Sequence, residues 1–308
     1  MTDLSIIIIG YNTQNSLLHL LSSINLQQFN QKYNVECIYV DDGSTDSSVE
    51  CFEKYNLLFE KKCIKLKKNK GRVYATQRGI NAATGKWLFF VRSNVFLKKN
   101  LFKEYFKSMH SVSGDAFMGR LLYTSKDKAF HRYLNNVNRG TNKYEHNSEI
   151  HYRHLLFGNS IFKSSLFKKQ NLNQNLRFYG GEEIDLAEKL FFLKNKKIYF
   201  CKQAVAVRNN HPSFYMHLER LKEFGEKNLP YLSKNNQKII LHFCFYLKKI
   251  KVLLPVWSCF LLFSKKTYKL NYLNSNYFLI RLGLISAIMV GICKSKQLQN
   301  YQNLDHLR

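Results

Sequence analysis

Two adjacent carboxylates, Asp41 and Asp42, end a short apolar run of the sequence and begin a turn. Gly43 permits a tight turn, and the Ser-Thr-Asp sequence at 44–46 can cap the helix that follows. Acids at the carboxyl end of a parallel strand lie where open α/β sheets bind ligands. Such a carboxylate can accept a hydrogen bond from a base ring N–H or from ribose hydroxyls. The turn is therefore a candidate ligand site, and a plain Asp-Gly turn with capping acids is the structural alternative.

Strand and helix patterns alternate around this turn. We expect strands at 6–9, 35–40, 64–66 and 87–91, and helices at 16–26, 47–55 and 72–83. Further strands are expected at 158–162, 197–200 and 204–207, with a helix at 184–194 and irregular loops and edge strands between 115 and 154. This order predicts an α/β fold with a mostly parallel central sheet flanked by helices.

The composition predicts a packed protein, because 45% of the 308 residues are hydrophobic and 15% are aromatic. The net charge of +27 indicates an anionic partner, which could be nucleic acid, an acidic membrane surface or a phosphorylated substrate, unless a general residue bias supplies it. Seven cysteines without a C-x-x-C pair favour reduced thiols in the cytosol. The first apolar run is interpreted as a strand and not as a secretory signal.

The C-terminal third has a different composition, and we expect a catalytic domain at 1–212 followed by a basic, apolar helical region at 213–308. No Asp or Glu occurs from Ile239 to Lys296. The uncharged runs Val252–Ser264 and Leu282–Cys293 are shorter than the roughly 20 residues that span a bilayer. Lysines beside such runs favour helices in the interface of an anionic leaflet, and packing on the core or in a dimer is the alternative.

The apolar opening strand with its Gly10-Tyr11-Asn12 end, followed by the acidic turn, resembles the nucleotide-binding half of family 2 glycosyltransferases with the GT-A fold. The stretch 69–85 resembles the family pattern N-x-G-x-x-x-A-R-N-x-G and keeps its Gly71. The Arg-Asn pair of that pattern is replaced by Thr76-Gln77, and Arg78 stands beside it, where it could reach a phosphate.

The resemblance implies a nucleotide-sugar donor, which we expect to carry UDP. In the proteins that this segment resembles, the first acid of the turn contacts the base. The donor-binding residues implied here are Gly10, Tyr11, Asn12, Asp41, Asp42, Gly71, Arg78, Arg92, Ser93 and Asn94.

The family's metal motif is changed in this sequence. The Asp-x-Asp that usually holds Mg²⁺ or Mn²⁺ against the diphosphate is Arg92-Ser93-Asn94 here. Asn94 offers one neutral oxygen and Arg92 would repel the ion, while His211 stands where related enzymes can ligate the metal or touch the diphosphate. Two hypotheses follow: the Arg92 guanidinium takes the diphosphate charge in place of the ion, or the donor chemistry has been lost.

A third motif, Gly180–Leu186, resembles the family's G-E-D-x-D-L turn. The resemblance implies that Glu183 is the general base for an acceptor hydroxyl, and that Glu182 binds acceptor hydroxyls or holds the turn. An acidic cap at a helix N-terminus is the structural alternative.

Together the motifs predict an inverting glycosyltransferase for cell-surface polysaccharide synthesis, acting by one direct displacement on a glycan or lipid-linked acceptor. We expect it in the cytoplasm, peripheral at the inner face of an anionic membrane, with no nucleic acid as partner because no nucleic-acid motif is present. The alternative is a catalytically silent, glycosyltransferase-like binding or scaffold module.

Overall fold

A computed structural model describes residues 2–27, 29, 33–168, 171–192, 195–242, 244, 253–270 and 276–295 of the chain. The chain forms two compact units. The sheet unit consists of Met1–Thr124, Asn135–Gln174 and Leu186–Asn210. The helical unit consists of Ser125–Leu134, Asn175–Asp185 and His211–Arg308. The chain thus enters the helical unit twice before it enters for the last time at His211, whereas the sequence predicted that the C-terminal region begins at 213.

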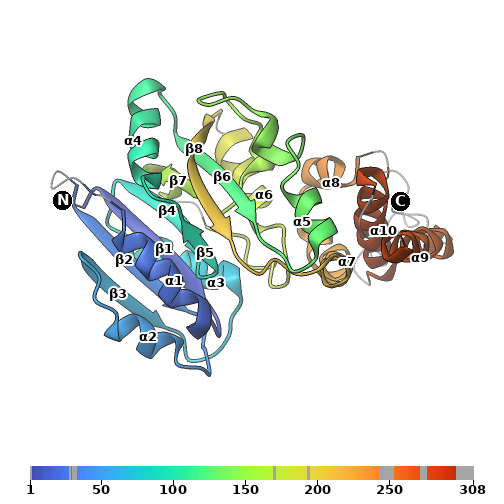
Figure 1. The fold of residues 1–308 in the computed structure, drawn as a ribbon, viewed down its shortest axis with the longest axis horizontal. Helices are drawn as coiled ribbons and strands as arrows, with labels where there is room; N and C mark the ends of the chain where they lie inside the picture. The colour runs from blue at the N-terminus through green and yellow to red at the C-terminus, as the bar shows by residue number, and fades with distance from the viewer. Residues whose placement is uncertain are drawn as a thin grey trace, which may run out of the picture. The chain divides into compact units, whose positions relative to one another are not determined.

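The described part of the sheet unit contains an eight-stranded sheet in the order β3-β2-β1-β4-β7-β6-β8-β5 (Figure 1). The strands are β1 Leu4–Gly10, β2 Val35–Asp41, β3 Glu60–Lys65, β4 Trp87–Arg92, β5 Val95–Leu97, β6 Ala116–Tyr123, β7 Ser160–Lys163 and β8 Ile198–Arg208. Strands β3, β2, β1 and β4 are parallel neighbours, as are β6 and β8. Strand β7 pairs antiparallel with β4 and β6, and β5 pairs antiparallel with β8. The predicted α/β fold with a mostly parallel sheet is confirmed.

Helices cover both faces of the parallel half of the sheet. They are α1 Gln14–Asn25, α2 Ser48–Lys54 and α3 Arg72–Ala82, with α4 Leu101–Ser111 near the other half. Tyr39 of β2 stacks on Phe52 of α2 with ring centroids 5.1 Å apart. Ile38 and Val40 of the same strand pack with Ala75 of α3. Because successive residues of a strand point to opposite faces, α2 and α3 lie on opposite sides of the sheet.

Two predictions about the second half of the sheet were wrong. The stretch predicted as irregular contains β6, an interior strand between β7 and β8. The two predicted closing strands are one strand, β8, in which Gly119 pairs with Cys201 but Arg120 pairs with Val205, so that residues 202–204 bulge from the ladder. In both cases polar residues interrupt the apolar pattern of a strand that continues.

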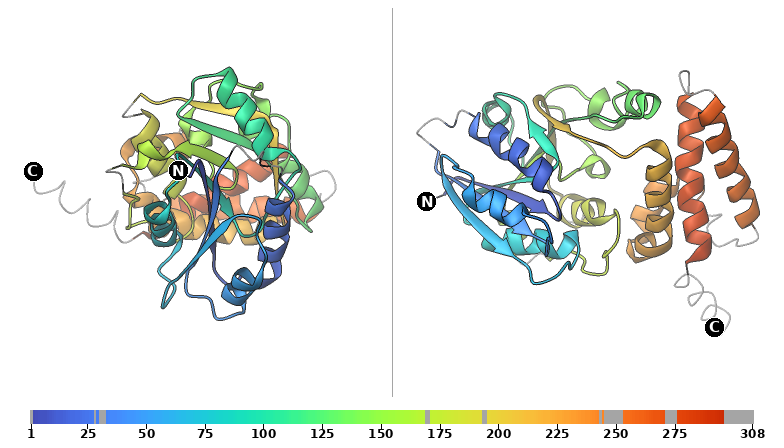
Figure 2. Two further views of the ribbon diagram at one scale, coloured as in Figure 1. Left: turned by 90° about the vertical axis from the view of Figure 1, so that its left-hand side faces the viewer. Right: turned by 60° about the horizontal axis from the view of Figure 1, so that its bottom comes forward.

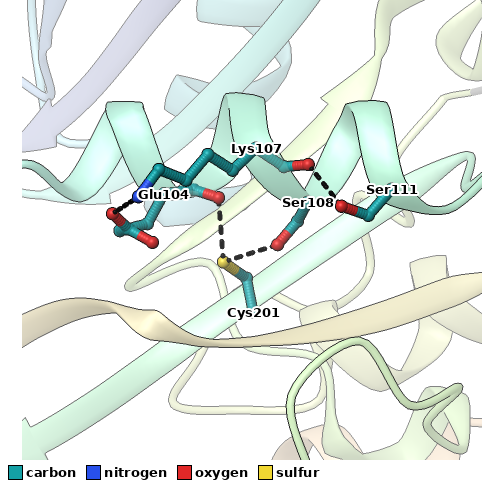
Figure 3. Close-up of polar contacts among 5 residues, drawn as sticks. All are labelled: Glu104, Lys107, Ser108, Ser111 and Cys201. Atoms are coloured by element: carbon teal, nitrogen blue, oxygen red, sulfur yellow. Dashed lines mark hydrogen bonds and ion pairs between the residues drawn. The ribbon is translucent and has the colours of Figure 1, made fainter.

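Buried polar contacts close the sheet around this bulge. The Asn159 side chain is fully buried and donates to the carbonyls of Arg120, at 3.1 Å, and Ala204, at 2.8 Å. On the α4 side, the Cys201 thiol lies 3.1 Å from the Ser108 hydroxyl and 3.4 Å from the Glu104 carbonyl (Figure 3). Burial raises the pKa of the Cys201 thiol. The two Asn159 hydrogen bonds satisfy the Arg120 and Ala204 carbonyls beside the bulge.

The helical unit contains α5 Lys128–Leu134, the start of α6 Glu182–Ala187, α7 Phe214–Glu223, α8 Lys234–Leu241, α9 Leu254–Leu270 and α10 Tyr277–Lys294. The unit also contains the π-helical turn η5 Phe224–Asn228 and the 3₁₀ turn η6 Leu229–Tyr231. The other short helical turns of the described chain belong to the sheet unit: the π-helical η4 Glu188–Phe192 and the 3₁₀ turns η1 Gly140–Lys143, η2 Tyr152–His154 and η3 Ser164–Phe167. The helix predicted at 184–194 is α6 followed by η4, and Lys194 lies outside the described residues.

The helix α10 contacts α9, α7 and η5, and Figure 2 shows the two C-terminal helices α9 and α10 side by side. Among the described residues α10 is the one helix long and apolar enough to cross a membrane, with a mean hydropathy of 1.7 over 18 residues. More than half of that stretch, 56%, is buried in the structure, as in the core helix of a globular domain. The predicted run Val252–Ser264 falls mainly in α9, and Val252 lies outside the described residues.

Candidate active site

Three adjacent parallel strands of the sheet unit end at the same edge. Gly10 at the end of β1 pairs with Asp41 of β2, and Ile9 pairs with Arg92 of β4. The predicted donor-binding residues of these strands therefore share the carboxyl edge of the sheet, where open α/β sheets bind ligands. The register of the strands, and not a loop conformation, fixes the spacing of Asp41, Gly10 and Arg92.

The Asp41 carboxylate is fully buried and organises the turn that follows it. One oxygen accepts a hydrogen bond from the Ser44 N–H at 2.9 Å. The other accepts from the Tyr39 hydroxyl at 3.3 Å and from the Ser44 hydroxyl. In this structure both oxygens are engaged within the turn, so its contact with the base stays a prediction.

Asp42 points to the opposite face of the sheet and holds the start of α3. Its two oxygens accept hydrogen bonds from the N–H groups of Lys70, at 2.8 Å, and Gly71, at 2.9 Å. Burial raises the pKa of the Asp42 carboxyl, against these two N–H bonds, which lower it. The neighbouring Gly43 has a φ of +76°, and a Cβ there would lie 2.5 Å from the Lys68 backbone. The close approach of the two loops thus requires glycine.

The loop after β1 is joined to the same turn. Asn12, with a φ of +51°, accepts a hydrogen bond from the Thr45 N–H at 2.9 Å and donates its own N–H to the Ser44 hydroxyl at 2.9 Å. A Cβ on Gly10 would lie 2.6 Å from the Tyr39 hydroxyl, so only glycine fits beneath this loop. The side chain of Tyr11 is 46% exposed, so that this loop presents an aromatic ring to solvent.

The residues that replace the family's Arg-Asn pair have structural partners. The Thr76 hydroxyl donates to the Arg72 carbonyl at 2.7 Å, and the Gln77 side chain accepts from the Leu172 N–H at 2.8 Å. Arg78 is exposed on the surface of α3, and Gly71 precedes that helix with a φ of +88°. The Gln77–Leu172 contact is a link that the sequence did not indicate, because the two residues are 95 positions apart.

The residues at the end of β4 do not fit a divalent cation. Arg92 is half-buried, Ser93 is 5% exposed, and the backbone carbonyl of Asn94 accepts from the Asn209 N–H at 2.9 Å. Within the described ranges no three His, Cys, Asp or Glu side chains lie close enough together to hold a metal. Hard cations require several oxygen ligands, and here a guanidinium and one amide replace the two carboxylates.

The predicted base belongs to the helical unit. Gly180 and Gly181 have φ values of +83° and +95°, a conformation that favours glycine, and the Asp185 N–H bonds to the Gly181 carbonyl at 3.0 Å to begin α6. Glu182 is 4% exposed, whereas Glu183 is half-buried at the first turn. Of the two acids, Glu183 is thus the one with a side chain accessible to solvent.

Asn228 forms hydrogen bonds that hold this glycine turn, and its role was not predicted from the sequence. Its fully buried side chain donates to the Gly180 carbonyl at 2.7 Å and accepts from the Phe178 N–H at 3.2 Å. Asn228 is the last residue of the π-helical turn η5, which rotates it relative to a regular helix. A single asparagine after Phe224-Gly225 carries no spacing signal that could have identified it.

His211, the other predicted metal ligand, also lies in the helical unit and is 6% exposed. Its Nδ1 is 3.0 Å from the Pro212 carbonyl, and its ring centroid lies 5.6 Å from that of Phe130 and 5.2 Å from that of His217. The imidazole is therefore held among aromatic rings, and its contact with a metal or a diphosphate stays a prediction.

The sequence profile of glycosyl transferase family 2 matches residues 5–171, which is more than half of the chain and includes every predicted donor-binding residue. The chain belongs to glycosyl transferase family 2. The predicted family is confirmed.

Proteins of Streptococcus pneumoniae and Staphylococcus aureus are similar in sequence to this chain. Glycosyltransferase GlyG of Streptococcus pneumoniae serotype 4 is 25% identical over 212 residues, which are 64% of this chain and 67% of GlyG. Glycosyltransferase GlyA of the same organism is 24% identical over 67% of this chain, but the chain spans only 30% of GlyA. The poly(ribitol-phosphate) beta-N-acetylglucosaminyltransferase TarS of Staphylococcus aureus is 30% identical over 105 residues, 34% of this chain and 18% of TarS.

Solved structures of the GT-A type share the fold. The S. aureus TarS fragment 1–349 in complex with UDP aligns with a TM-score of 0.60 at 16% identity, covering 98% of this chain and 92% of the fragment. The mannosyltransferase PcManGT from Pyrobaculum calidifontis, in complex with GDP-Man and Mn²⁺, aligns with a TM-score of 0.63 at 14% identity, covering 94% and 85%. The predicted GT-A fold is confirmed.

Proposed function

We propose that the chain is an inverting glycosyltransferase that moves a sugar from a UDP-linked donor to a glycan or lipid-linked acceptor in cell-envelope polysaccharide synthesis. The names of two relatives support the process: TarS acts on poly(ribitol-phosphate), and GgaA of Bacillus subtilis is a minor teichoic acid biosynthesis protein. The observation that carries the proposal is the register that sets Asp41, Gly10 and Arg92 at one edge of three parallel strands.

In this proposal the sheet unit binds the donor. The edge around Gly10, Asp41 and Tyr11 receives the nucleoside, and Arg92 faces the diphosphate. A guanidinium presents several N–H donors in a fork that matches phosphate oxygens, and its charge is permanent. Because Arg92 is half-buried, solvent screens that charge less than on an open surface. The leaving diphosphate is then stabilised without a divalent cation.

The helical unit supplies the base. The acceptor hydroxyl oxygen attacks the anomeric carbon while the bond from that carbon to the diphosphate oxygen breaks, and the hydroxyl proton passes to the Glu183 carboxylate. A single displacement of this kind inverts the configuration at the anomeric carbon. The short helix that begins beside Glu183 favours a carboxylate at this position. Asn228 acts here as a positioning residue, because it holds the glycine turn before the acids.

A second candidate function is supported by the changed metal motif. With Arg92 and Asn94 in place of two acids, the chain could bind a nucleotide-sugar without turning it over. Slow release of UDP from the donor in the absence of acceptor would require catalysis and would exclude such a silent binding module.

The test is a panel of UDP-GlcNAc, UDP-glucose, UDP-galactose and GDP-mannose in thermal unfolding, each with Mn²⁺ and with EDTA. A ligand that binds only the folded state at 100 times its Kd adds about 2.7 kcal/mol to the free energy of unfolding. We expect one UDP-sugar to raise the Tm equally in both buffers. If no nucleotide-sugar raises the Tm in either buffer, the proposed donor site is wrong.

A further inference from the structure

One face of α9, which we call its inner face, is packed against the rest of the helical unit. Trp257, Leu261, Ser264 and Tyr268 recur at helical spacing, and all four are buried. The Ser264 hydroxyl donates to the Leu279 carbonyl of α10 at 2.8 Å. The Tyr268 ring lies 4.3 Å from that of Phe214, and its hydroxyl donates to Asp127. Two of these four inner-face residues are thus polar, and their hydroxyls form hydrogen bonds within the helical unit.

The opposite side of α9 is more apolar than the side it buries. We define the outer face of α9 as Pro255, Val256, Cys259, Phe260, Leu262, Phe263, Lys266, Lys269 and Leu270, all of which are exposed. Phe260 is 41% exposed, Phe263 is 53% exposed and Leu262 is 65% exposed. The first three turns of this face carry only apolar side chains and cysteine, and the last turns carry the lysines. Such a continuous exposed apolar surface indicates a binding partner.

The charge around the outer face favours an anionic partner. The whole stretch from Ile239 to Lys296 has no acidic residue. Lys265, on the flank of α9, is paired with Glu219 at 3.1 Å, whereas Lys266 and Lys269 extend into solvent on the outer face itself. A symmetric contact with a second copy would place the same acid-free surface on both sides, so that lysines would meet lysines. A bilayer with anionic headgroups satisfies both the apolar turns and the lysines.

The dimensions of α9 favour an orientation in the plane of the interface over a transmembrane one. Its 17 residues rise about 26 Å, which is less than the hydrocarbon thickness of a bilayer. One of its faces is also packed on α10. A helix with one face held by the protein can offer lipid only its other face, and it therefore lies in the plane of the interface.

We propose that the outer face of α9 inserts into an anionic leaflet, with Phe260, Leu262 and Phe263 among the acyl chains and Lys266 and Lys269 at the lipid phosphates. The long lysine side chains reach the headgroups from a helix that lies below them. This docking requires neither donor nor acceptor, so it stands or fails separately from the proposed transferase activity. It would hold the protein at the surface where lipid-linked acceptors are found.

Vesicle sedimentation of the full chain tests the proposal. The vesicles are pure phosphatidylcholine, or phosphatidylcholine with about one third phosphatidylglycerol. We expect binding to the anionic vesicles that weakens with salt, and a partition coefficient that falls at least about tenfold in Phe260→Gln/Phe263→Gln. Lys266→Gln/Lys269→Gln should cause a loss of about tenfold on the anionic vesicles only.

A matched pair of leucine variants separates the outer face from surface hydrophobicity in general. Leu262→Gln on α9 and Leu58→Gln in the sheet unit remove leucines that are 65% and 75% exposed. Only Leu262→Gln should weaken vesicle binding, and circular dichroism with the Tm checks that both variants are folded. Equal binding by the two variants, or undiminished binding by the double phenylalanine variant, would overturn the proposal.

A depth probe on the same face gives an independent measurement. Cys259 is exposed, whereas Cys51 and Cys63 are partly buried and the other four cysteines are buried. An environment-sensitive fluorophore on Cys259, in a Cys51→Ser/Cys63→Ser background, should shift to the blue with anionic vesicles and be quenched by acyl-chain quenchers. Binding to duplex DNA with the same salt dependence, or self-association that the double phenylalanine variant abolishes, would assign the face to another partner.

Discussion

The donor edge of the sheet unit and the glycine turn of the helical unit are built in different ways. At the donor edge, three parallel strands and three loops are tied together by backbone register and by side-chain bonds from Asp41, Asp42 and Asn12. At the glycine turn, one buried side chain, Asn228, holds the backbone before Glu183. If the proposed roles are right, donor binding and proton transfer depend on separate sets of contacts, so that variants should affect one without the other.

The largest expected effect separates turnover from donor binding. Glu183→Gln removes the proposed base and should lower turnover roughly 10²–10⁴-fold. The UDP affinity, which we assign to the sheet unit in the proposed function, should stay within about twofold of the original in calorimetry. As a control, Glu223→Gln removes another partly exposed acid of the helical unit, one paired with Lys227, and should leave both quantities unchanged. Equal loss of binding and turnover in Glu183→Gln would show that the two sites are not separable.

The second-largest expected effect is a loss of stability of the sheet unit when Gly43, in the turn after β2, is replaced. Gly43 and Gly140 both have a left-handed backbone, with φ values of +76° and +58°. A Cβ on Gly43 would meet the Lys68 backbone at 2.5 Å, whereas nothing lies within 4 Å of one on Gly140. Gly140→Ala should cost about 1 kcal/mol of the free energy of unfolding, and Gly43→Ala about 3 kcal/mol. Denaturant unfolding measures both, and equal losses would mean that the two loops do not need their close approach.

The matching variant in the helical unit is Asn228→Ala. It leaves the Gly180 carbonyl and the Phe178 N–H without their side-chain partner, which should cost about 1–3 kcal/mol of stability. We also expect kcat to fall about tenfold with an unchanged UDP affinity, because Asn228 acts through the turn that carries Glu183. A purely structural role would lower the Tm without changing kcat per folded molecule. Asn228→Asp places a buried carboxylate oxygen against the Gly180 carbonyl in place of the N–H donor, and it should recover neither loss.

The smallest effect is a pH dependence of the sheet unit's stability. Burial, followed by the charge of Arg153, lowers the pKa of His154 to about 4, whereas an unfolded histidine titrates near 6.5. Between these values the unfolded state binds the proton and the folded state does not. The contribution of His154 to stability is therefore complete above about pH 6.5 and is lost as the pH falls toward 4. His154→Gln should flatten the slope of the free energy of unfolding over this window, measured by denaturant titration, and an unaltered slope would contradict the assignment.

The sequence predicted the parallel half of the sheet well, because its apolar strands end in turn residues of clear chemistry. Asp41, Gly10 and Arg92 could be assigned to strand ends before any coordinates, since parallel strands end at a common edge. It predicted β6 and β8 poorly, because Gly119-Arg120 and the bulge at 202–204 break the alternation that marks a strand. Contacts between residues that are distant in the sequence hold the strands together at those breaks, and no local sequence pattern indicates such contacts.

Side-chain roles were harder to predict than strand ends. Nothing in the sequence distinguishes Asn228 from the many other asparagines, since its importance comes from a π-helical turn and two distant backbone groups. The buried face of α9 is likewise not evident from hydrophobicity, because it includes Ser264 and Tyr268 while Phe260, Leu262 and Phe263 are exposed. Tertiary contacts, and not local propensity, settle both cases.

The claim that a guanidinium replaces the metal at the end of β4 is tested most directly by calorimetric titration of UDP into the original protein and into Arg92→Ala, each with EDTA and with Mn²⁺. The account predicts that EDTA leaves the UDP affinity of the original protein unchanged and that Arg92→Ala weakens it about tenfold or more in both buffers. UDP binding that disappears in EDTA, returns with Mn²⁺ and is unaffected by Arg92→Ala would contradict it.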